Sequence, residues 1–578
     1  MRLKKIMIIK EKVLGITLFS LFMSIGWITG ISPLKTSLKT SQEASLSIKR
    51  MFADGPVLNL NNDYVSSNQY KIDILHYDLE LDLYPKEKML KGIAEIIGVT
   101  LKPELDRIDL NFYNNLKIKE LTLNNLSAKF ENEGTKLSVF LDDVRMDTFK
   151  LKVVYEGTPK LAGLSAFVFG EIDGRSAVYN LSEPSYASTW FPCNDIPSDK
   201  VLLDIKITND SSQTSISNGF LVSKELNRDR MTYHWKTYYP ISTYLICLYS
   251  SKYVEFEDKY ISADGDTMPI QYYAFPNQLD EAKIDFKDTP KMIAFFSKTF
   301  GEYPFIKEKY GIAEFLWQMG AMEHQTITGI GSNFVGGKNF FEDVYVHELA
   351  HHWWGNAVGP ATWKDIWLNE GFATYSEALY AESKSGKDAL QSTMLNKFSD
   401  EFSNMLYDPG ENLFSPTVYD KGAWVLHMLR WEVGDSIFFE ILRTYFEKFK
   451  YKSAATNDFI HVCENLSKRD LTKFFDQWVF TGKENIQLDY KWIIKKESDG
   501  KNLIILSLTQ SQENYSTFEF KLEVKLEYDN GKSSSKIFYI NEKETTIEIL
   551  VDEQPNQLVL DPNSWLLANI KDRNSYED

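Results

Sequence analysis

The sequence predicts a multidomain α+β protein: an all-β N-terminal domain, a mixed and then mostly helical middle, and a small C-terminal β-sandwich. Apolar residues recur at every second position in both outer regions, which is typical of half-buried strands. In the middle region they recur at helical spacing. With 578 residues, 43% of them hydrophobic, the chain has material for two to four domains. The predicted boundaries are 57–255, 256–484 and 485–578.

Short strands separated by Gly, Asn and Asp define the first region. The stretch 70–83 alternates between apolar and polar residues, and 151–155 and 201–207 repeat the pattern. These segments predict an all-β domain of about 200 residues.

The middle region is predicted to start with a helix at 280–296 and a strand at 309–315. A helix at 339–354 follows, with Asn339 as its cap and Glu342 three residues later. Further helices are predicted at 365–383, 421–449 and 470–480. Strands return at 504–508, 518–526 and 546–551, which indicates a small β-sandwich of about 85 residues.

The first 34 residues predict an export signal or a membrane anchor. Five basic residues precede position 13, and 13–31 then runs without a charge. At about 1.5 Å per residue this run is long enough to cross a bilayer as a helix. An uncleaved anchor is favoured over a cleaved signal, since no clear Ala-x-Ala site follows. Residues 35–56 are predicted to be a linker, which places the remaining domains outside the cytoplasm, either anchored to the cell membrane or secreted.

The composition excludes some classes of function. The net charge is −17 and the sequence has no basic run, which argues against nucleic-acid binding. Three cysteines, Cys193, Cys247 and Cys463, share no metal-binding spacing and are too few for a disulfide framework. We expect them to be buried as small apolar side chains.

A metal-binding pattern stands in the middle region. His347 and His351 form H-E-x-x-H with Glu348 between them, and Glu370 follows 19 positions after the second histidine. Residues four apart lie on one face of a helix, so both imidazoles can point at one ion. A catalytic zinc site takes three protein ligands and keeps one open position, and a carboxylate from a second helix can be the third ligand. The pattern predicts one zinc ion per chain, with Glu348 as the general base toward a zinc-activated water.

Several further motifs resemble the aminopeptidase N family of zinc metallopeptidases, over about residues 57–570 and in the same domain order. The resemblance implies a thermolysin-like catalytic domain and hydrolysis of the N-terminal peptide bond. The motifs that carry it are Glu183 to Pro197 with its Phe-Pro-Cys-Asn-Asp-Ile-Pro block, Gly320-Ala-Met-Glu-His, His347-Glu-x-x-His with Glu370, Tyr419-Asp-Lys-Gly-Ala, Phe474-Phe-Asp-Gln-Trp-Val and Leu560-Asp-Pro-Asn-Ser-Trp-Leu-Leu.

The resemblance also implies residue roles. His347, His351 and Glu370 would bind zinc, Glu348 would be the base and Tyr419 would donate a hydrogen bond to the oxyanion. A peptide amino terminus is a cation near neutral pH, so a carboxylate beside the metal can select it by charge. A hydroxyl aimed at the oxyanion stabilises the tetrahedral intermediate.

Substrate contacts are implied for another group of residues. Glu323 would bind the free α-amine with help from Glu183, and Gly320 and Ala321 would contact the substrate. Met319 is predicted either to line the first side-chain pocket or to pack in the core. Glu377, seven residues after Glu370, is predicted either to orient a ligand histidine or to be a solvated carboxylate.

Two departures from the family pattern modify these expectations. Leu181 stands where the family often has Gln, so a two-residue amine contact through Glu183 is in doubt. The sequence ends after the β-sandwich, whereas many members carry a long helical C-terminal domain over the active site. We therefore expect a short form with a more open cleft that accepts peptides longer than dipeptides.

The leading hypothesis is a monomeric zinc aminopeptidase acting on peptides with a free N-terminus and attached to the membrane by its N-terminal segment. A thermolysin-type endopeptidase would share the zinc motif but would not need the substrate amine. A catalytically silent, surface-anchored binding protein is the remaining alternative, and the intact set of ligands, base and tyrosine argues against it.

Overall fold

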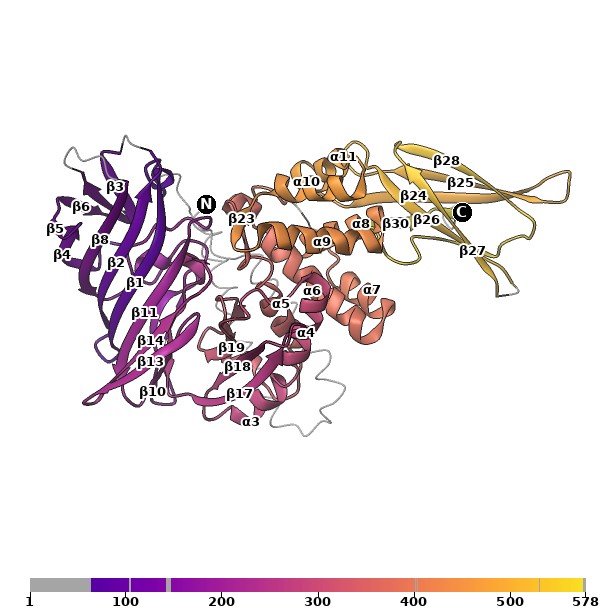
Figure 1. Ribbon diagram of the computed structural model, residues 1–578. Coiled ribbons are helices and arrows are strands. Elements are labelled where there is room, and N and C mark those ends of the chain that lie inside the picture. The colour runs from indigo at the N-terminus through magenta and orange to yellow at the C-terminus, as the bar shows by residue number, and fades with distance from the viewer. Residues whose placement is uncertain are drawn as a thin grey trace, which may run out of the picture. The chain divides into compact units, whose positions relative to one another are not determined.

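The computed structural model describes residues 64–102, 105–141, 147–400, 402, 404–529 and 531–574. The predicted signal or anchor at 1–34 and the linker at 35–56 lie outside this range. Among the described residues, no helix is both long and apolar enough to span a bilayer. The multidomain α+β class predicted from the sequence is confirmed (Figure 1).

The N-terminal domain is built of strands, and its large sheet follows the order β13-β14-β11-β1-β2-β8-β4-β5, with β15 paired to β11. Alternation in β1 changes phase once. Ile72 and Ile74 point into the core, as do Tyr77, Leu79 and Leu81, because the register shifts at a bulge between residues 74 and 76. The strands of this sheet are β1 (Ile72–Tyr84), β2 (Met89–Thr100), β4 (Lys117–Leu123), β5 (Leu126–Ser127), β8 (Thr148–Gly157), β11 (Lys200–Asp210), β13 (Phe220–Asn227), β14 (Arg230–Lys236) and β15 (Ile241–Ser242).

Two smaller sheets complete this domain. They have the orders β12-β16-β10-β9 and β3-β7-β6. Their strands are β3 (Arg107–Asn111), β6 (Phe130–Glu133), β7 (Lys136–Phe140), β9 (Ala166–Ile172), β10 (Arg175–Leu181), β12 (Thr214–Ile216) and β16 (Tyr249–Ser251).

The central domain begins with a five-stranded mixed sheet of order β17-β18-β19-β21-β20, followed by helices (Figure 1). β18, β19 and β21 run parallel, and β20 lies antiparallel to β21 at the edge of the sheet. The sheet strands are β17 (Val254–Ile261), β18 (Thr267–Ala274), β19 (Tyr310–Phe315), β20 (Ala321–Met322) and β21 (Thr328–Gly331), and a separate parallel pair is β22 (Val358–Pro360) and β23 (Lys452–Ala454). The helices are α3 (Leu279–Asp285), α4 (Thr289–Phe300), α5 (Glu342–Ala350), α6 (Trp367–Ser385), α7 (Lys387–Asn396), α8 (Gly422–Val433), α9 (Asp435–Phe449), α10 (Thr456–Ser467) and α11 (Thr472–Phe475), with π-helical turns at Thr417–Lys421 and Asp476–Phe480.

The predicted bounds of three helices were wrong. The helix predicted at 280–296 is divided into α3 and α4, with Pro290 in the first turn of α4, where its missing N–H costs no hydrogen bond. The helix predicted at 421–449 is divided at Gly434, whose φ of 86° is a left-handed value that ends a helix. The predicted zinc helix starts at Glu342 rather than Asn339, and it ends at Ala350.

Asn339 is therefore not the helix cap. Its φ is 55°, and its backbone N–H donates to Asp285 Oδ1 at 2.7 Å. The other carboxylate oxygen of Asp285 accepts from the N–H groups of Gly336 and Gly337. The carboxylate holds residues 336–339 as a loop, which delays the start of α5.

The C-terminal domain is a two-sheet β-sandwich, as predicted. Its sheets have the orders β28-β25-β24-β30 and β27-β26-β29. Leu506 and Ile549 of the first sheet and Leu522 and Val524 of the second are buried. The strands are β24 (Ile486–Lys496), β25 (Asn502–Gln510), β26 (Phe520–Glu527), β27 (Ser533–Ile540), β28 (Glu544–Val551), β29 (Gln557–Leu560) and β30 (Ala568–Asp572).

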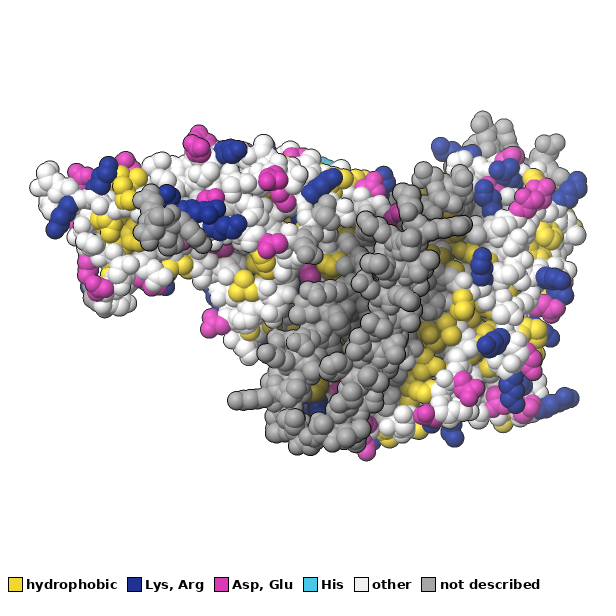
Figure 2. Space-filling model, turned by 180° about the vertical axis from the view of Figure 1, so that it is seen from behind, with side chains coloured by type: hydrophobic (Ala, Val, Ile, Leu, Met, Phe, Trp, Pro, Cys, Tyr) yellow, Lys and Arg dark blue, Asp and Glu magenta, His cyan; other side chains and the backbone are white. Residues whose placement is uncertain are grey.

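Acidic and basic side chains are interspersed on the face shown in Figure 2. All three cysteines are buried and free, as expected.

Candidate active site

His347 of α5, His351 at the C-terminal cap of α5 and Glu370 of α6 bring three ligand atoms together. His347 Nε2 and His351 Nε2 are 3.0 Å apart, and they lie 3.4 and 3.3 Å from Glu370 Oε2. Ligand atoms in a tetrahedral zinc site with bonds of about 2.05 Å are separated by about 3.3 Å. The observed spacing therefore fits one zinc ion.

The opposite ring nitrogens of both histidines are fixed. His347 Nδ1 lies 2.9 Å from Glu377 Oε1, and His351 Nδ1 lies 3.0 Å from the Trp354 carbonyl oxygen. Each Nδ1–H donates to an oxygen, which leaves each Nε2 to face the metal. Lys397 Nζ holds the second oxygen of Glu377 at 2.6 Å. Of the two alternatives predicted for Glu377, the structure has the contact with a ligand histidine.

The site favours positive charge. Burial alone would lower the pKa of both histidines, but the surrounding carboxylates, Glu370 among them, raise the pKa of His347 to about 10 and of His351 to about 9. Burial alone would likewise raise the pKa of Glu370, yet the two imidazoles hold it at about 2. A divalent cation at the point where these groups meet satisfies the same electrostatic preference.

Glu348 flanks the ligands on α5 without being one of the three. Its side chain is buried, and Oε2 has no hydrogen-bond partner among the described residues. Burial raises the pKa of Glu348 to about 8, with Glu323 and Glu370 adding to the effect. This carboxylate can accept a proton from a molecule that occupies the cleft.

Tyr419 reaches the ligands from the π-helical turn before α8. Its ring stacks on the ring of His347, with 5.9 Å between centroids. Burial and the nearby carboxylates raise the pKa of the phenol well above its ordinary value, so the hydroxyl keeps its proton and can donate it in a hydrogen bond. The sequence carried no signal for the π-helical turn, although such turns are frequent at functional sites.

A close approach of α6 and α8 sets the distance between Glu370 and Tyr419. Gly371 follows the predicted ligand and packs against Gly422, three residues after the tyrosine. A Cβ added to Gly371 would lie 2.9 Å from Gly422 Cα, and one added to Gly422 would lie 2.8 Å from Gly371 Cα. Two glycines are required for this crossing.

A cluster of carboxylates adjoins the metal ligands. Glu183 of the N-terminal domain and Glu323 of the central domain each place an oxygen within 4.8 Å of Glu370. Both side chains are buried, and Glu183 Oε1 and Glu323 Oε1 have no partner among the described residues. Burial raises the pKa of both carboxyl groups, and it raises the pKa of Glu183 more strongly than that of Glu323. Buried carboxylates without donors call for a cationic or hydrogen-bonding ligand.

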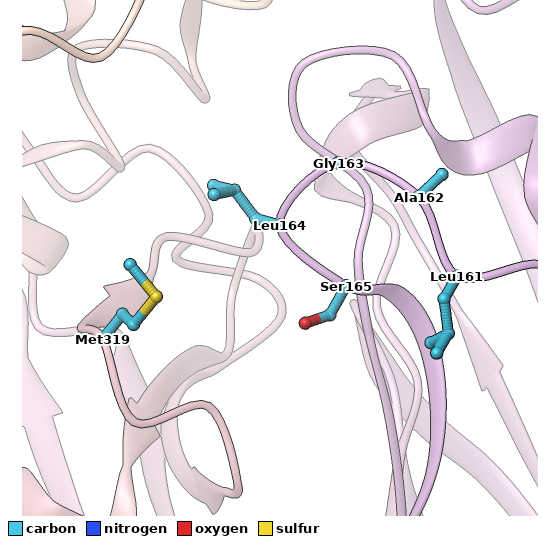
Figure 3. Close-up of a pocket in the computed structure, with 6 residues that line it drawn as sticks. All are labelled: Leu161, Ala162, Gly163, Leu164, Ser165 and Met319. Atoms are coloured by element: carbon cyan, nitrogen blue, oxygen red, sulfur yellow. The ribbon is translucent and has the colours of Figure 1, made fainter. Parts of the chain in front are cut away.

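The remaining predicted residues lie at the edge of the central sheet. Gly320 and Ala321 are half-buried at the start of β20, and the Gly320 carbonyl accepts from Gly331 N–H at 3.1 Å. Met319 lines an apolar cavity of about 370 Å³, opposite the loop 161–165 of the N-terminal domain. The side chains of Met319 and Leu164 point into the space between the two segments (Figure 3). No sequence pattern predicted that this loop would lie beside Met319, because its proximity depends on how the domains pack.

The N-terminal domain also positions the site through hydrogen bonds. Lys200 Nζ donates to the carbonyls of Asn356 and Ala357, and Asn356 Nδ2 donates to the Glu323 carbonyl at 2.7 Å. His324, which clusters with the ligand histidines in sequence, instead bonds the Tyr249 hydroxyl through Nδ1. None of these supporting residues except His324 belonged to a motif, so sequence reasoning did not single them out.

This fold and this ligand set define the class of zinc metalloproteins in which two histidines of one helix and a glutamate of the next hold the metal. Residues 74–245 match the peptidase M1 N-terminal domain, and residues 284–478 match the peptidase family M1 domain. Together these matches span more than half of the chain. The chain belongs to peptidase family M1, and zinc is its cofactor.

Curated relatives of the chain include proteins named as aminopeptidases. The chain is 25% identical over 519 residues to mitochondrial aminopeptidase 2 of Saccharomyces cerevisiae, covering 82% of this chain and 53% of that protein. It is 24% identical over 433 residues to the probable aminopeptidase 1 of Sulfurisphaera tokodaii, covering 71% of this chain and 53% of that one. The chain thus spans about half the length of these curated relatives.

Solved structures agree with the fold. The M1 zinc metallopeptidase of Deinococcus radiodurans is 27% identical, with a TM-score of 0.64, and the match covers 71% of this chain and 93% of that one. A mutant of the same protein was solved with a Tyr-Ser-Ala substrate. Aminopeptidase A of Legionella pneumophila shares the fold at 18% identity, with a TM-score of 0.76 and coverage of 88% and 60%.

Proposed function

We propose that this protein is a zinc aminopeptidase that hydrolyses the N-terminal peptide bond of peptides. The observation that carries the proposal is the pair of buried carboxylate oxygens of Glu183 and Glu323 beside the metal ligands, neither of which has a hydrogen-bond partner in the described part of the chain. A substrate ammonium group satisfies both oxygens and neutralises charge there. Requiring that group restricts cleavage to the end of a chain.

The positions of the residues support the following proposed roles. His347, His351 and Glu370 would hold zinc, which would supply a Lewis acid and lower the pKa of water. Glu348 takes the proton of the attacking water and passes it to the leaving amine. Tyr419 donates its O–H to the oxygen that becomes negative. Glu183 and Glu323 bind the amine and thereby fix which bond lies beside the base.

The apolar cavity supports a substrate class. Met319 and Leu164 face each other across it, and Leu161 and Ala162 complete the apolar lining. Gly320 and Ala321, at the open edge of the sheet, can pair with the backbone of an extended peptide. Peptides with an apolar first residue are the expected substrates, and peptides longer than dipeptides are expected to be cleaved.

Aminoacyl fluorogenic amides, each offered with a free and with an acetylated amine, test the proposal. Free-amine substrates should be hydrolysed, acetylated ones should not, and a chelator should abolish turnover. Cleavage of acetylated peptides would favour the thermolysin-type endopeptidase. Full zinc occupancy with no turnover on any substrate would favour the silent binding protein.

We further propose that the enzyme acts outside the cytoplasm, held at the cell membrane by residues 13–31 or secreted. The basic flank followed by an uncharged run supports this. Cell fractionation with an externally added protease tests it: cleavage only after lysis would contradict it. We also propose a monomer, which light scattering during size exclusion tests: a larger assembly would contradict it.

A further inference from the structure

The loop that carries Glu323 contains one residue with left-handed backbone angles, which surrounding contacts must stabilise. This loop connects β20 to β21, and Thr326 within it has a φ of 68°. A β-branched residue rarely adopts left-handed backbone angles, and such residues persist where surrounding contacts hold them. The contacts of Thr326, together with the hydrogen bond from Asn356 Nδ2 to the Glu323 carbonyl, therefore position Glu323.

His352, the residue after the second ligand histidine, provides one of these contacts. The Thr326 backbone N–H donates to His352 Nε2 at 3.1 Å. His352 Nδ1 lies 3.2 Å from the Glu348 carbonyl oxygen. A backbone N–H can only donate, so Nε2 carries no proton, and Nδ1–H donates to that carbonyl. One imidazole thus joins the backbone of the proposed base to the loop of the proposed amine ligand.

The imidazole is rigidly placed. His352 is fully buried, and its ring packs against Tyr303 at 5.7 Å, Tyr310 at 5.0 Å and Phe305 at 6.1 Å between centroids. On the other side of the loop, Gly219 N–H donates to Thr326 Oγ1 at 2.9 Å. The loop is held between the N-terminal domain and the zinc helix.

We propose that His352 is a positioning residue that sets the distance between Glu348 and Glu323 and thereby the selection of a free substrate amine. The inference rests on the proposed function. It assigns His352 no contact with metal or substrate. Loss of the Nε2 acceptor should release Thr326 and loosen Glu323, while the two histidine ligands keep their own supports in Glu377 and the Trp354 carbonyl.

Two amide substitutions distinguish the roles of the two ring nitrogens of His352. In His352→Gln the side-chain oxygen can reach the place of Nε2 and accept from Thr326. In His352→Asn the shorter side chain reaches only the place of Nδ1. The readout is the ratio of inhibition constants for leucine hydroxamate and its des-amino analogue, 4-methylpentanohydroxamate, because this ratio measures amine recognition. We expect His352→Gln to keep the wild-type ratio within about threefold and His352→Asn to reduce it roughly tenfold, with unchanged affinity for the des-amino compound.

Tyr303→Phe is the matched control. It removes a buried hydrogen bond from the Tyr303 hydroxyl to the Lys309 carbonyl in the same aromatic cluster and leaves in place both partners of the hydrogen bond from Thr326 N–H to His352 Nε2. The control should keep the wild-type ratio and zinc content. An unchanged ratio in His352→Asn, or an equal loss of affinity for both hydroxamates, would overturn the inference. Absence of any amine preference in the wild-type protein would instead overturn the proposed function.

A measurement on the wild-type protein does not depend on folding of the variants. With ¹⁵N-labelled histidine in the zinc-loaded chain, His352 should show a protonated Nδ1 and an unprotonated Nε2. Protonation of Nε2 would overturn the inference whatever the variants show.

Discussion

Gly371→Ala tests whether the crossing of α6 and α8 sets the geometry of the active site. The new Cβ would lie 2.9 Å from Gly422 Cα, whereas non-bonded carbons prefer about 3.5–4.0 Å. The helices must therefore separate by roughly 0.6–1 Å. Overpacking of this kind costs about 1–3 kcal/mol, and the higher helix propensity of alanine returns about 1 kcal/mol. The expected loss of stability is only about 0–2 kcal/mol.

The effect on catalysis should be larger than the effect on stability. Glu370 and Tyr419 lie on opposite sides of the crossing, so separating the helices moves one relative to the other. A misplacement of about 1 Å can cost a factor of ~100 in rate, equivalent to about 2.7 kcal/mol. We expect kcat/KM on a leucyl amide to fall about 100-fold in a protein that still unfolds cooperatively in urea.

Gly336→Ala is the control, because a Cβ there meets no atom within 4 Å. It should leave both kcat/KM and the urea midpoint close to wild type. A Gly371→Ala protein with kcat/KM within twofold of wild type would refute the reasoning, since it would show that the site tolerates the separation of the two helices.

Three further predictions concern other residues. Glu348→Gln should retain zinc by metal analysis yet lose at least ~100-fold in kcat, and retained turnover would refute its role as base. Glu323→Gln should weaken inhibition by leucine hydroxamate far more than inhibition by its des-amino analogue, and an equal effect on both would contradict amine binding. Burial would raise the pKa of Asp204, but hydrogen bonds with Lys236, His234 and His76 outweigh burial and lower it. Because the folded pKa lies below the unfolded one, the stabilisation is present above about pH 4 and is lost as pH falls through the folded pKa. Asp204→Asn should flatten the decline of the unfolding free energy below about pH 4 in urea titrations, and an unchanged slope would contradict this.

The metal ligands could be predicted from sequence because their geometry is local. Four residues separate His347 from His351, and helical periodicity alone places both side chains on one face. The same periodicity placed Glu377 on the face of Glu370, since seven residues is two turns of α6, but it left open whether Glu377 contacts a ligand histidine, as it does, or is solvated. The alternation of the outer regions predicted their β-structure for a similar reason.

Other features depend on contacts between distant parts of the chain. The cavity beside Met319 needs the loop 161–165, which is brought there by domain packing. The start of α5 is set by Asp285, more than fifty residues earlier, and the sequence around Asn339 does not reveal it. The two divided helices are different, because Gly434 and the Thr-Pro pair at 289–290 were visible breakers that the apolar periodicity outweighed.

The pairing of Glu183 with Glu323 has an evolutionary consequence. The metal ligands and Glu348 lie on two consecutive helices of one domain, whereas the carboxylates proposed to recognise the substrate are divided between two domains. Reactivity and selectivity can therefore be inherited separately. Recombination that exchanges the segment around residue 183, or the loop 161–165, would alter which peptides are accepted and leave the hydrolytic chemistry intact. Specificity can accordingly change through the N-terminal domain as well as through the segment 319–323 of the central domain.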